Sequence, residues 1–275
     1  KQTTLLFRWA RIMKRLFGAV MIGALVMSAL WGCRSEPERV RVYSSDYASL
    51  QYLEPGEFDR EQSLYWNLPE NPYHAYRCHV SVSEEGLLIS NQSGRQETYL
   101  TQFDNGYFIG VDLGEFDGWV RYVPYFSTLP EAGDSVLVSD ENCRGILAKD
   151  RRNGYLLTGD ALAMTGSIYL LQCSDAGDQW TWKLLAALEE LPLACTYEKE
   201  QELLYVVTSG SILSVSADQQ VSTLVRSGMF NEIGANSVVF YEDSFWCGSP
   251  MGVYRYCVQT GEEIWYPMDY AAHVG

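Results

Sequence analysis

Short apolar runs and polar turns alternate along the chain from residue 77 onward. Runs of four to eight apolar residues are separated by clusters of Gly, Asp, Asn and Ser, a pattern typical of strands joined by hairpins. Turns are predicted at residues 84–86, 104–106 and 153–154, and Asn-Gly is a strong hairpin signal because both residues accept positive φ. The stretch KLLAALEELP, residues 183–192, is the one helix-like candidate of this region, and we interpret its first half as strand.

Three segments repeat the same order of strands and turns. They cover residues 144–188, 194–225 and 236–267, and each reads as four strands. Tyr155, Leu204 and Phe245 occupy matching places, 49 and 41 residues apart. A further unit begins 48 residues before Tyr155. A period of about 40 to 50 residues with four strands per unit is typical of a β-propeller blade.

The last of these segments also resembles known blade repeats. Residues 244–266, SFWCGSPMGVYRYCVQTGEEIWY, are similar to blades of the quinoprotein-like and two-component-regulator-like propeller families. The residues that match are Trp246, Gly252, Val253, Tyr254, Arg255, Tyr256, Thr260, Gly261 and Glu262. The resemblance implies a fold and no activity, because propellers host many unrelated functions. In such a blade the second strand lies between its neighbours, so we expect Trp246 to pack against the adjacent blade.

The predicted fold is all-β: a β-propeller of about five to six four-stranded blades over residues 73–275, preceded by an N-terminal apolar signal helix. A propeller must close on itself to bury its edge strands. Two outcomes are open at the end of the chain. Either YAAHV, residues 270–274, adds a closing strand, or the propeller is incomplete.

Residues 13–33, MKRLFGAVMIGALVMSALWGC, have the composition of a secretory signal peptide. Lys14 and Arg15 precede 16 uncharged residues, 16–31, which is shorter than the roughly 20 that a membrane-spanning helix needs. Met13 is the natural start of such a signal, and residues 1–32 are predicted to be removed.

The end of this segment resembles the lipobox of bacterial lipoprotein signals, which has Leu at −3, a small residue at −1 and Cys at +1. Leu30, Gly32 and Cys33 match, whereas Trp31 departs from the usual small or β-branched residue. The resemblance implies lipidation of Cys33, cleavage before it, and a chain anchored to the cell membrane at its extracytoplasmic face. The alternative is an ordinary transmembrane anchor with an incidental cysteine.

Residues 33–72 are predicted to be a tether and connecting segment ahead of the propeller. The stretch VRVYSSDYASLQYL, residues 40–53, is interpreted as a first strand or a strand pair. Residues 54–74 are rich in turn formers and acids, and we expect a loop with a short helix there.

The charge of the mature chain excludes one class of partner. Residues 1–32 carry five basic residues and no acidic one, so 15 basic and 35 acidic residues remain, a formal charge of −20. Such a surface repels phosphate backbones. Nucleic acid is therefore not expected as a partner, whereas a protein or glycan ligand is compatible with this surface.

Six cysteines remain if Cys33 is lipidated. They are scattered, without CxxC or a close Cys/His cluster, which disfavours a zinc site. Most stand inside apolar strand-like runs, where a free thiol behaves as a small buried hydrophobe. We favour buried thiols over a disulfide framework for the six residues Cys78, Cys143, Cys173, Cys195, Cys247 and Cys257.

No constellation of catalytic residues stands out. His74 and His79 flank Cys78, but adjacent residues of a strand point to opposite faces, so a metal site is not predicted there. Asp175 and Asp178 lack the dense spacing of a calcium loop. No spacing selects a glycosidase pair among the carboxylates Asp112, Glu115, Asp117, Asp140, Glu141, Asp160, Asp175 and Asp178. No catalytic residue, metal or cofactor is therefore assigned.

Two functions are compatible with the sequence. The first is a non-enzymatic binding or scaffold lipoprotein whose propeller holds a protein, peptide or glycan. The second is a propeller hydrolase or lyase acting on extracellular polysaccharide. Two or more carboxylates converging on the central channel with a His, Tyr or Arg favour the enzyme, whereas a channel lined by small and apolar groups favours the scaffold.

Overall fold

The computed structural model describes residues 40–43, 50–53, 55–58, 76–83, 86–93, 98–114, 116–125, 135–176 and 179–268. These residues form twenty strands and one short helix, α3 (Met229–Ile233). Nearly all of the described chain is therefore β, as predicted. The signal segment, Cys33 and residues 269–275 lie outside the described residues, so their predictions are not tested.

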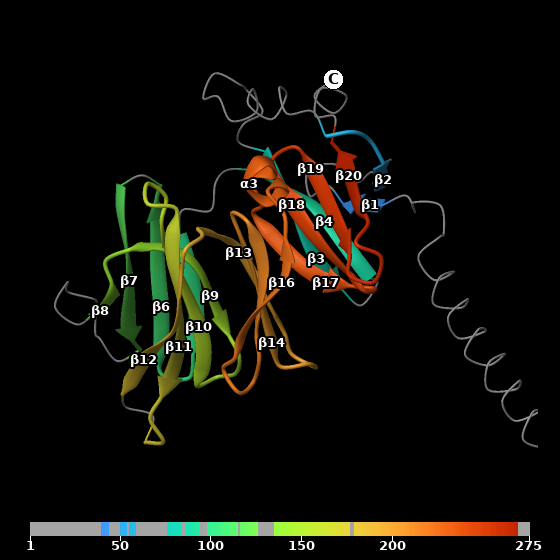
Figure 1. The fold of residues 1–275 in the computed structure, drawn as a ribbon. Coiled ribbons are helices and arrows are strands. Elements are labelled where there is room, and N and C mark those ends of the chain that lie inside the picture. Colours follow the sequence, from blue (N-terminus) through green and yellow to red (C-terminus); the bar gives the residue numbers. More distant parts are fainter. Residues whose placement is uncertain are drawn as a thin grey trace, which may run out of the picture.

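The strands build five four-stranded sheets, which are the blades of a propeller (Figure 1). The first sheet contains β1 (Val40–Tyr43), β2 (Leu50–Leu53), β3 (Tyr76–Ser83) and β4 (Gly86–Ser93). The second contains β5 (Thr98–Phe103), β6 (Gly106–Leu113), β7 (Phe116–Pro124) and β8 (Val136–Ser139). The third contains β9 (Asn142–Ala148), β10 (Asn153–Asp160), β11 (Thr165–Cys173) and β12 (Trp180–Leu188). The fourth contains β13 (Pro192–Glu198), β14 (Leu203–Thr208), β15 (Ser211–Val215) and β16 (Val221–Arg226). The fifth contains β17 (Ser237–Tyr241), β18 (Ser244–Ser249), β19 (Gly252–Cys257) and β20 (Glu263–Pro267).

The repeat read from the sequence is confirmed. The segments predicted at 144–188, 194–225 and 236–267 coincide with the third, fourth and fifth sheets to within a few residues. Tyr155, Leu204 and Phe245 each lie near the start of the second strand of their sheet, in β10, β14 and β18. The helix-like stretch before Pro192 is strand as far as Leu188, the end of β12.

One hairpin differs from the prediction. The Asn105–Gly106 region does turn between β5 and β6, but Asn153 and Gly154 already belong to β10. The chain instead turns at residues 149–152, where the carboxylate of Asp150 accepts hydrogen bonds from the backbone N–H groups of Arg152 and Asn153. The aspartate thus stabilises a longer turn, which moves the Asn-Gly pair into the strand.

The first sheet takes its outer half from the segment predicted to precede the propeller. β1 and β2 pair antiparallel, which confirms a strand pair, and β1 lies parallel to β4. The chain then passes to the fifth sheet, where the backbone N–H of Gly56 donates to the carbonyl of Trp265 at 2.8 Å. Phe58 packs edge-on against Trp265. The described part of the connecting segment therefore belongs to the propeller and links its first and last blades.

The innermost strands of the five sheets pack in the order β5, β9, β13, β17 and β3. β3 and β5, which would close the ring, pack much less closely than the other neighbours. The burial of the second strands also marks this loose contact between the first and second blades. β10, β14 and β18 are buried on both faces over almost their whole length, whereas alternate residues of β6 are only partly buried.

Glycine permits the close approach between blades. A Cβ placed on Gly110 of β6 would lie 2.3 Å from the sulfur of Cys143 in β9, and one on Gly145 would lie 2.5 Å from the sulfur of Cys195 in β13. The six cysteines of the described chain are free, as expected from their apolar surroundings. Burial raises the pKa of Cys247 to about 12, so this thiol stays protonated at neutral pH.

Trp246 is buried in a hydrophobic cluster to which several blades contribute. It belongs to a buried cluster that contains Val80 and Ile89 of the first sheet, and it stacks on Tyr266 of its own sheet with ring centroids 5.8 Å apart. Its indole N–H donates to the carbonyl of Tyr241. No helix among the described residues is long and apolar enough to span a membrane.

Replacing Trp246 with alanine should lower the free energy of unfolding by about 3–5 kcal/mol, because a large aromatic is deleted from a buried cluster to which several blades contribute. Urea unfolding followed by circular dichroism measures the loss. Trp182→Ala, in the outer strand β12, is the matched control and should cost less because Trp182 is only partly buried. Equal losses in the two variants would contradict a core role for Trp246 in this cluster.

Candidate functional site

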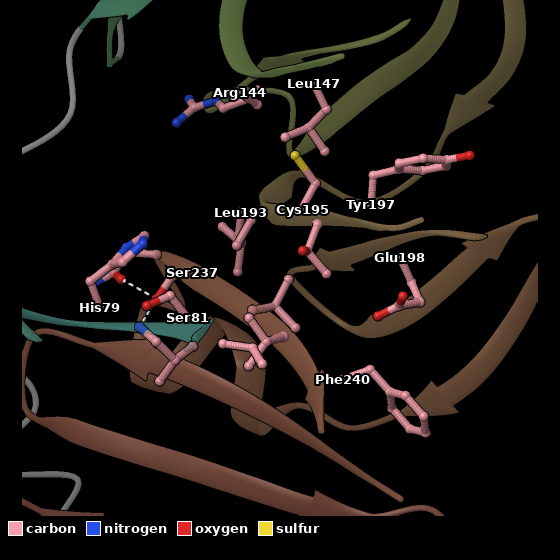
Figure 2. Close-up of a pocket in the computed structure, with 18 of the residues that line it drawn as sticks. His79, Ser81, Arg144, Leu147, Leu193, Cys195, Tyr197, Glu198, Ser237 and Phe240 are labelled. Atoms are coloured by element: carbon pink, nitrogen blue, oxygen red, sulfur yellow. Dashed lines mark hydrogen bonds between the residues drawn. The ribbon is translucent and has the colours of Figure 1, made fainter. Parts of the chain in front are cut away.

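A cavity of about 480 Å³ lies where the five inner strands converge (Figure 2). Every inner strand contributes to its wall: β3 through His79 and Ser81, β5 through Tyr99, and β9 through Arg144. β13 and β17 complete the wall with the residues Leu193, Ala194, Cys195, Thr196, Tyr197, Glu198, Ser237, Val238, Val239 and Phe240. The cavity is therefore the central channel of the propeller, the place where this fold brings together residues distant in sequence.

Bulges bring two side chains to this wall. In β9, Cys143 pairs with Thr158 and Gly145 pairs with Leu157, so Arg144 is the extra residue between two adjacent pairs. The same shift occurs in β13, where Leu193 is the extra residue. A bulge inserts an unpaired residue that bends the strand and re-aims its side chain. Equivalent bulges of neighbouring blades thus contribute an arginine and a leucine to the cavity.

Arg144 is held by a buried ion pair. Its Nη1 lies 2.8 Å from Oδ2 of Asp112 in β6, and the two side chains are 10% and 3% exposed. The other carboxylate oxygen of Asp112 accepts the backbone N–H of Gly114 at 2.9 Å. Asp112 compensates the charge of Arg144 from the neighbouring blade and does not line the cavity itself.

The protein leaves several donors at this site without partners. Nε and Nη2 of Arg144 are buried and make no hydrogen bond to the protein, and the same holds for Nδ2 of Asn236. Both residues line the cavity. A buried donor without a partner costs about 1–3 kcal/mol, so folds rarely retain one without a reason.

The other titratable groups of the wall are mostly neutral at pH 7. Desolvation lowers the pKa of His79 below its ordinary value of 6.5, and burial raises the pKa of Tyr99. Burial raises the pKa of Cys195 to about 12. In the view of Figure 2, Arg144 and His79 lie at the left, and Tyr197, Glu198 and Phe240 lie at the right. The wall therefore presents a cation and a carboxylate at separate places.

Among the carboxylates considered from the sequence, those that the structure describes do not converge. Asp112 is bound to Arg144, Glu141 accepts the hydroxyl of Thr158, and Asp160 accepts backbone N–H groups of its own turn. Asp140 and Asp175 are exposed. The structure does not describe His74, Glu115, Asp178, His273 or the side chain of Asp117.

Cys78 and His79 point to opposite sides of β3, as expected. Cys78 is buried against Met268, with its sulfur 3.5 Å from the sulfur of that methionine, whereas His79 lines the cavity. Within the described residues, no group of three or more His, Cys, Asp or Glu side chains is arranged to hold a metal ion.

Sequence reasoning did not single out Arg144. The sequence held one weak signal for it. In the aligned repeats, Arg144 stands near the start of the first strand, at the place that residues near Leu193 and Asn236 take in the next two repeats. Arg144 is therefore a basic residue on an inner strand of its blade. No repeat comparison could show that a bulge turns this side chain toward the channel, because a bulge depends on strand pairing.

No protein-family model and no curated protein sequence matches the chain. Among solved structures, similar folds include the WD40 β-propeller domain of Doa1, at 19% identity and a TM-score of 0.31 over 42% of this chain and 38% of that chain. A functionally unknown protein from Desulfotomaculum acetoxidans DSM 771 matches at 12% identity and a TM-score of 0.42, over 81% of this chain and 76% of that chain.

An auxiliary nutrient binding protein from Bacteroides thetaiotaomicron VPI-5482 matches at 10% identity and a TM-score of 0.36, over 69% of this chain and 54% of that chain. The chain thus spans less than two thirds of the Doa1 and nutrient-binding chains. TM-scores this low do not support a fold assignment by themselves. The propeller assignment therefore rests on the five sheets and on the cavity that their inner strands share.

Replacing Asp112 with alanine should lower the free energy of unfolding by about 3–5 kcal/mol, because the charge of Arg144 stays buried without compensation. Adding Arg144→Met should restore a large part of that loss, since the uncompensated charge is then removed. Thermal and urea unfolding of the two single variants and the double variant measure the coupling. Asp140→Ala, at an exposed position, is the control, and an Asp112→Ala loss no larger than that of the control would contradict a buried ion pair.

Proposed function

We propose that this chain is a membrane-anchored extracytoplasmic lipoprotein whose β-propeller binds a protein, peptide or glycan without catalysing a reaction. One observation carries the binding function: all five inner strands contribute residues to the wall of one cavity of about 480 Å³. Ligand sites are concave, with a few polar groups that fix orientation on a largely apolar wall.

Binding fits the wall better than polysaccharide cleavage. A glycosidase of the usual type needs two carboxylates facing each other across the substrate. Among the described lining residues the carboxylate is Glu198, and the nearby Asp112 is already paired with Arg144. Small and apolar residues such as Ala194, Val238 and Val239 also line the cavity, although polar atoms form the larger part of its surface.

The anchor is proposed from the sequence alone, on the lipobox-like residues Leu30, Gly32 and Cys33. The first described strand begins at Val40, seven residues after Cys33. A chain of that length spans at most about 25 Å when fully extended. A lipid on Cys33 would therefore hold the propeller close to the membrane surface, where a short tether suits capture of envelope ligands.

The anchor is tested by Cys33→Ser. The variant should lose incorporation of an alkyne fatty acid and either appear in the medium or stay unprocessed, because the thiol that takes the lipid is gone. Cys257→Ser, a buried propeller cysteine, is the matched control and should keep the label. Equal labelling of Cys33→Ser and the unmodified protein would refute the anchor without touching the binding proposal.

The cavity is tested by filling it. The purified propeller is screened by thermal shift against panels of short peptides and oligosaccharides, and hits are measured by calorimetry. Ser81→Trp, which fills the wall at β3, should weaken binding of any hit at least tenfold. Ser83→Trp lies two residues along the same strand at an exposed position and should leave binding unchanged. Absence of any hit, or equal binding to Ser81→Trp, would exclude the cavity as the binding site.

A further inference from the structure

We infer that the ligand of this propeller is a neutral oligosaccharide, which extends from the central cavity past Tyr197 into a groove beside it. The inference rests on the proposed binding function and names the class of ligand. It starts from two independent observations: two further pockets continue the central cavity, and cations in their walls are paired with carboxylates.

Two pockets next to the central cavity form the groove. The first, of about 470 Å³, shares Leu147, Thr196 and Tyr197 with the cavity. The second, of about 420 Å³, shares Gln102 and Arg151 with the first. Much of the wall comes from the β5–β6, β9–β10 and β13–β14 hairpins of the second, third and fourth blades. Because the pockets share walls, one extended ligand can contact the cavity and the groove together.

The polar side chains of the groove are accessible to a ligand. Gln102, Arg151 and Lys199 are exposed, and Thr196 and Tyr197 are partly exposed. A ligand that leaves the cavity through this groove therefore reaches their polar atoms without any movement of the blades.

Two cations of the groove wall are already paired. Nζ of Lys149 lies 3.2 Å from Oε2 of Glu202, and Nη1 of Arg151 lies 3.9 Å from Oδ1 of Asp104. The carboxylate of Asp150 accepts backbone N–H groups of its own turn. A charged ligand would compete with these contacts, and a polyanion would also meet the negative net charge of the chain. A neutral ligand with many hydroxyl groups meets neither cost.

The remaining charges do not select an ionic ligand either. Lys199 is flanked in sequence by Glu198 and Glu200, at the turn that follows β13. In the central cavity, Asp112 compensates the charge of Arg144. The described wall of cavity and groove therefore offers no excess of either sign that would attract an ion.

Tyr197 gives the junction of cavity and groove the chemistry of a sugar site. A pyranose ring has an apolar C–H face and a rim of hydroxyl groups, so it needs an aromatic surface beside polar side chains. The ring of Tyr197 supplies that surface, and burial raises the pKa of its phenol, which stays neutral at pH 7. The amide of Gln102 offers donors and an acceptor to hydroxyl groups. Glu198, which lies on the same side of the view as Tyr197 in Figure 2, offers a further acceptor.

The surface of the site favours a sugar over a peptide. Protein and peptide ligands are anchored by a few large side chains in fully desolvated pockets. Polar atoms form the larger part of the cavity surface, and Leu147 and Tyr197 add apolar surface where the groove begins. Polar and apolar surface are thus mixed along the whole path, which suits a chain of sugar units that repeat the same mixture.

The test uses the neutral hexasaccharides cellohexaose, maltohexaose, xylohexaose and N-acetylchitohexaose. Calorimetry on the purified protein should detect binding of at least one of them. The disaccharide of the same linkage should bind at least tenfold more weakly, because it is too short to contact both the cavity and Gln102. Tyr197→Ala should weaken binding of the hexasaccharide at least tenfold, whereas Tyr197→Phe keeps the ring and should stay within threefold of the unmodified protein.

Gln102→Ala tests the groove at an exposed position, so it keeps the inference testable if Tyr197→Ala does not fold. It should weaken binding of the hexasaccharide at least threefold, because the amide hydrogen bonds are lost. Gln172→Ala, at an exposed position of β11 outside the pocket walls, is the matched control and should bind like the unmodified protein.

Three results would overturn the inference. The first is tighter binding of hexagalacturonate, or of a peptide from the panel, than of every neutral hexasaccharide, which would still leave a binding propeller. The second is equal binding of the hexasaccharide to Tyr197→Ala, Gln102→Ala and the unmodified protein, which would exclude the groove. The third is failure of all four hexasaccharides to bind, and the peptide panel with Ser81→Trp then decides the proposed function separately.

Discussion

The close approach of neighbouring blades governs the rest of this structure. Inner strands reach a common axis only if nothing bulky stands between one sheet and the next, and Gly110 and Gly145 meet the sulfurs of Cys143 and Cys195 at distances that no Cβ could tolerate. Small thiol side chains fill the space that remains. The same contacts exclude water from the interfaces, which explains why aromatic and aliphatic side chains of the second strands are buried on both faces in β10, β14 and β18.

The convergence of the blades also creates the site. Five strands that meet around an axis cannot fill the axis itself with regular β structure, so a cavity remains where their edges face one another. The bulges in β9 and β13 place Arg144 and Leu193 on its wall, and Asp112 from the preceding blade stabilises the arginine. A structural ion pair between blades thus holds a cation beside the cavity.

The seam between the first and second blades shows how the ring is held. β3 packs against β17 of the last blade, and the segment after β2 adds Gly56 and Phe58 against Trp265. These contacts fasten the first blade to the last one. The second blade packs closely on one side only, and the partly buried positions of β6, together with Leu100 at 64% exposure in β5, mark its other face.

Much of the fold was readable from the sequence, because strands and turns depend on local patterns. The alternation of apolar and polar residues and the spacing of Tyr155, Leu204 and Phe245 predicted the blades, and the apolar settings of the cysteines predicted free thiols. The candidate site was not readable in this way. Arg144 acquires its role from a β-bulge, from Asp112 on another blade and from a wall built by five strands, and such contacts between residues far apart in sequence exist only once the blades have assembled.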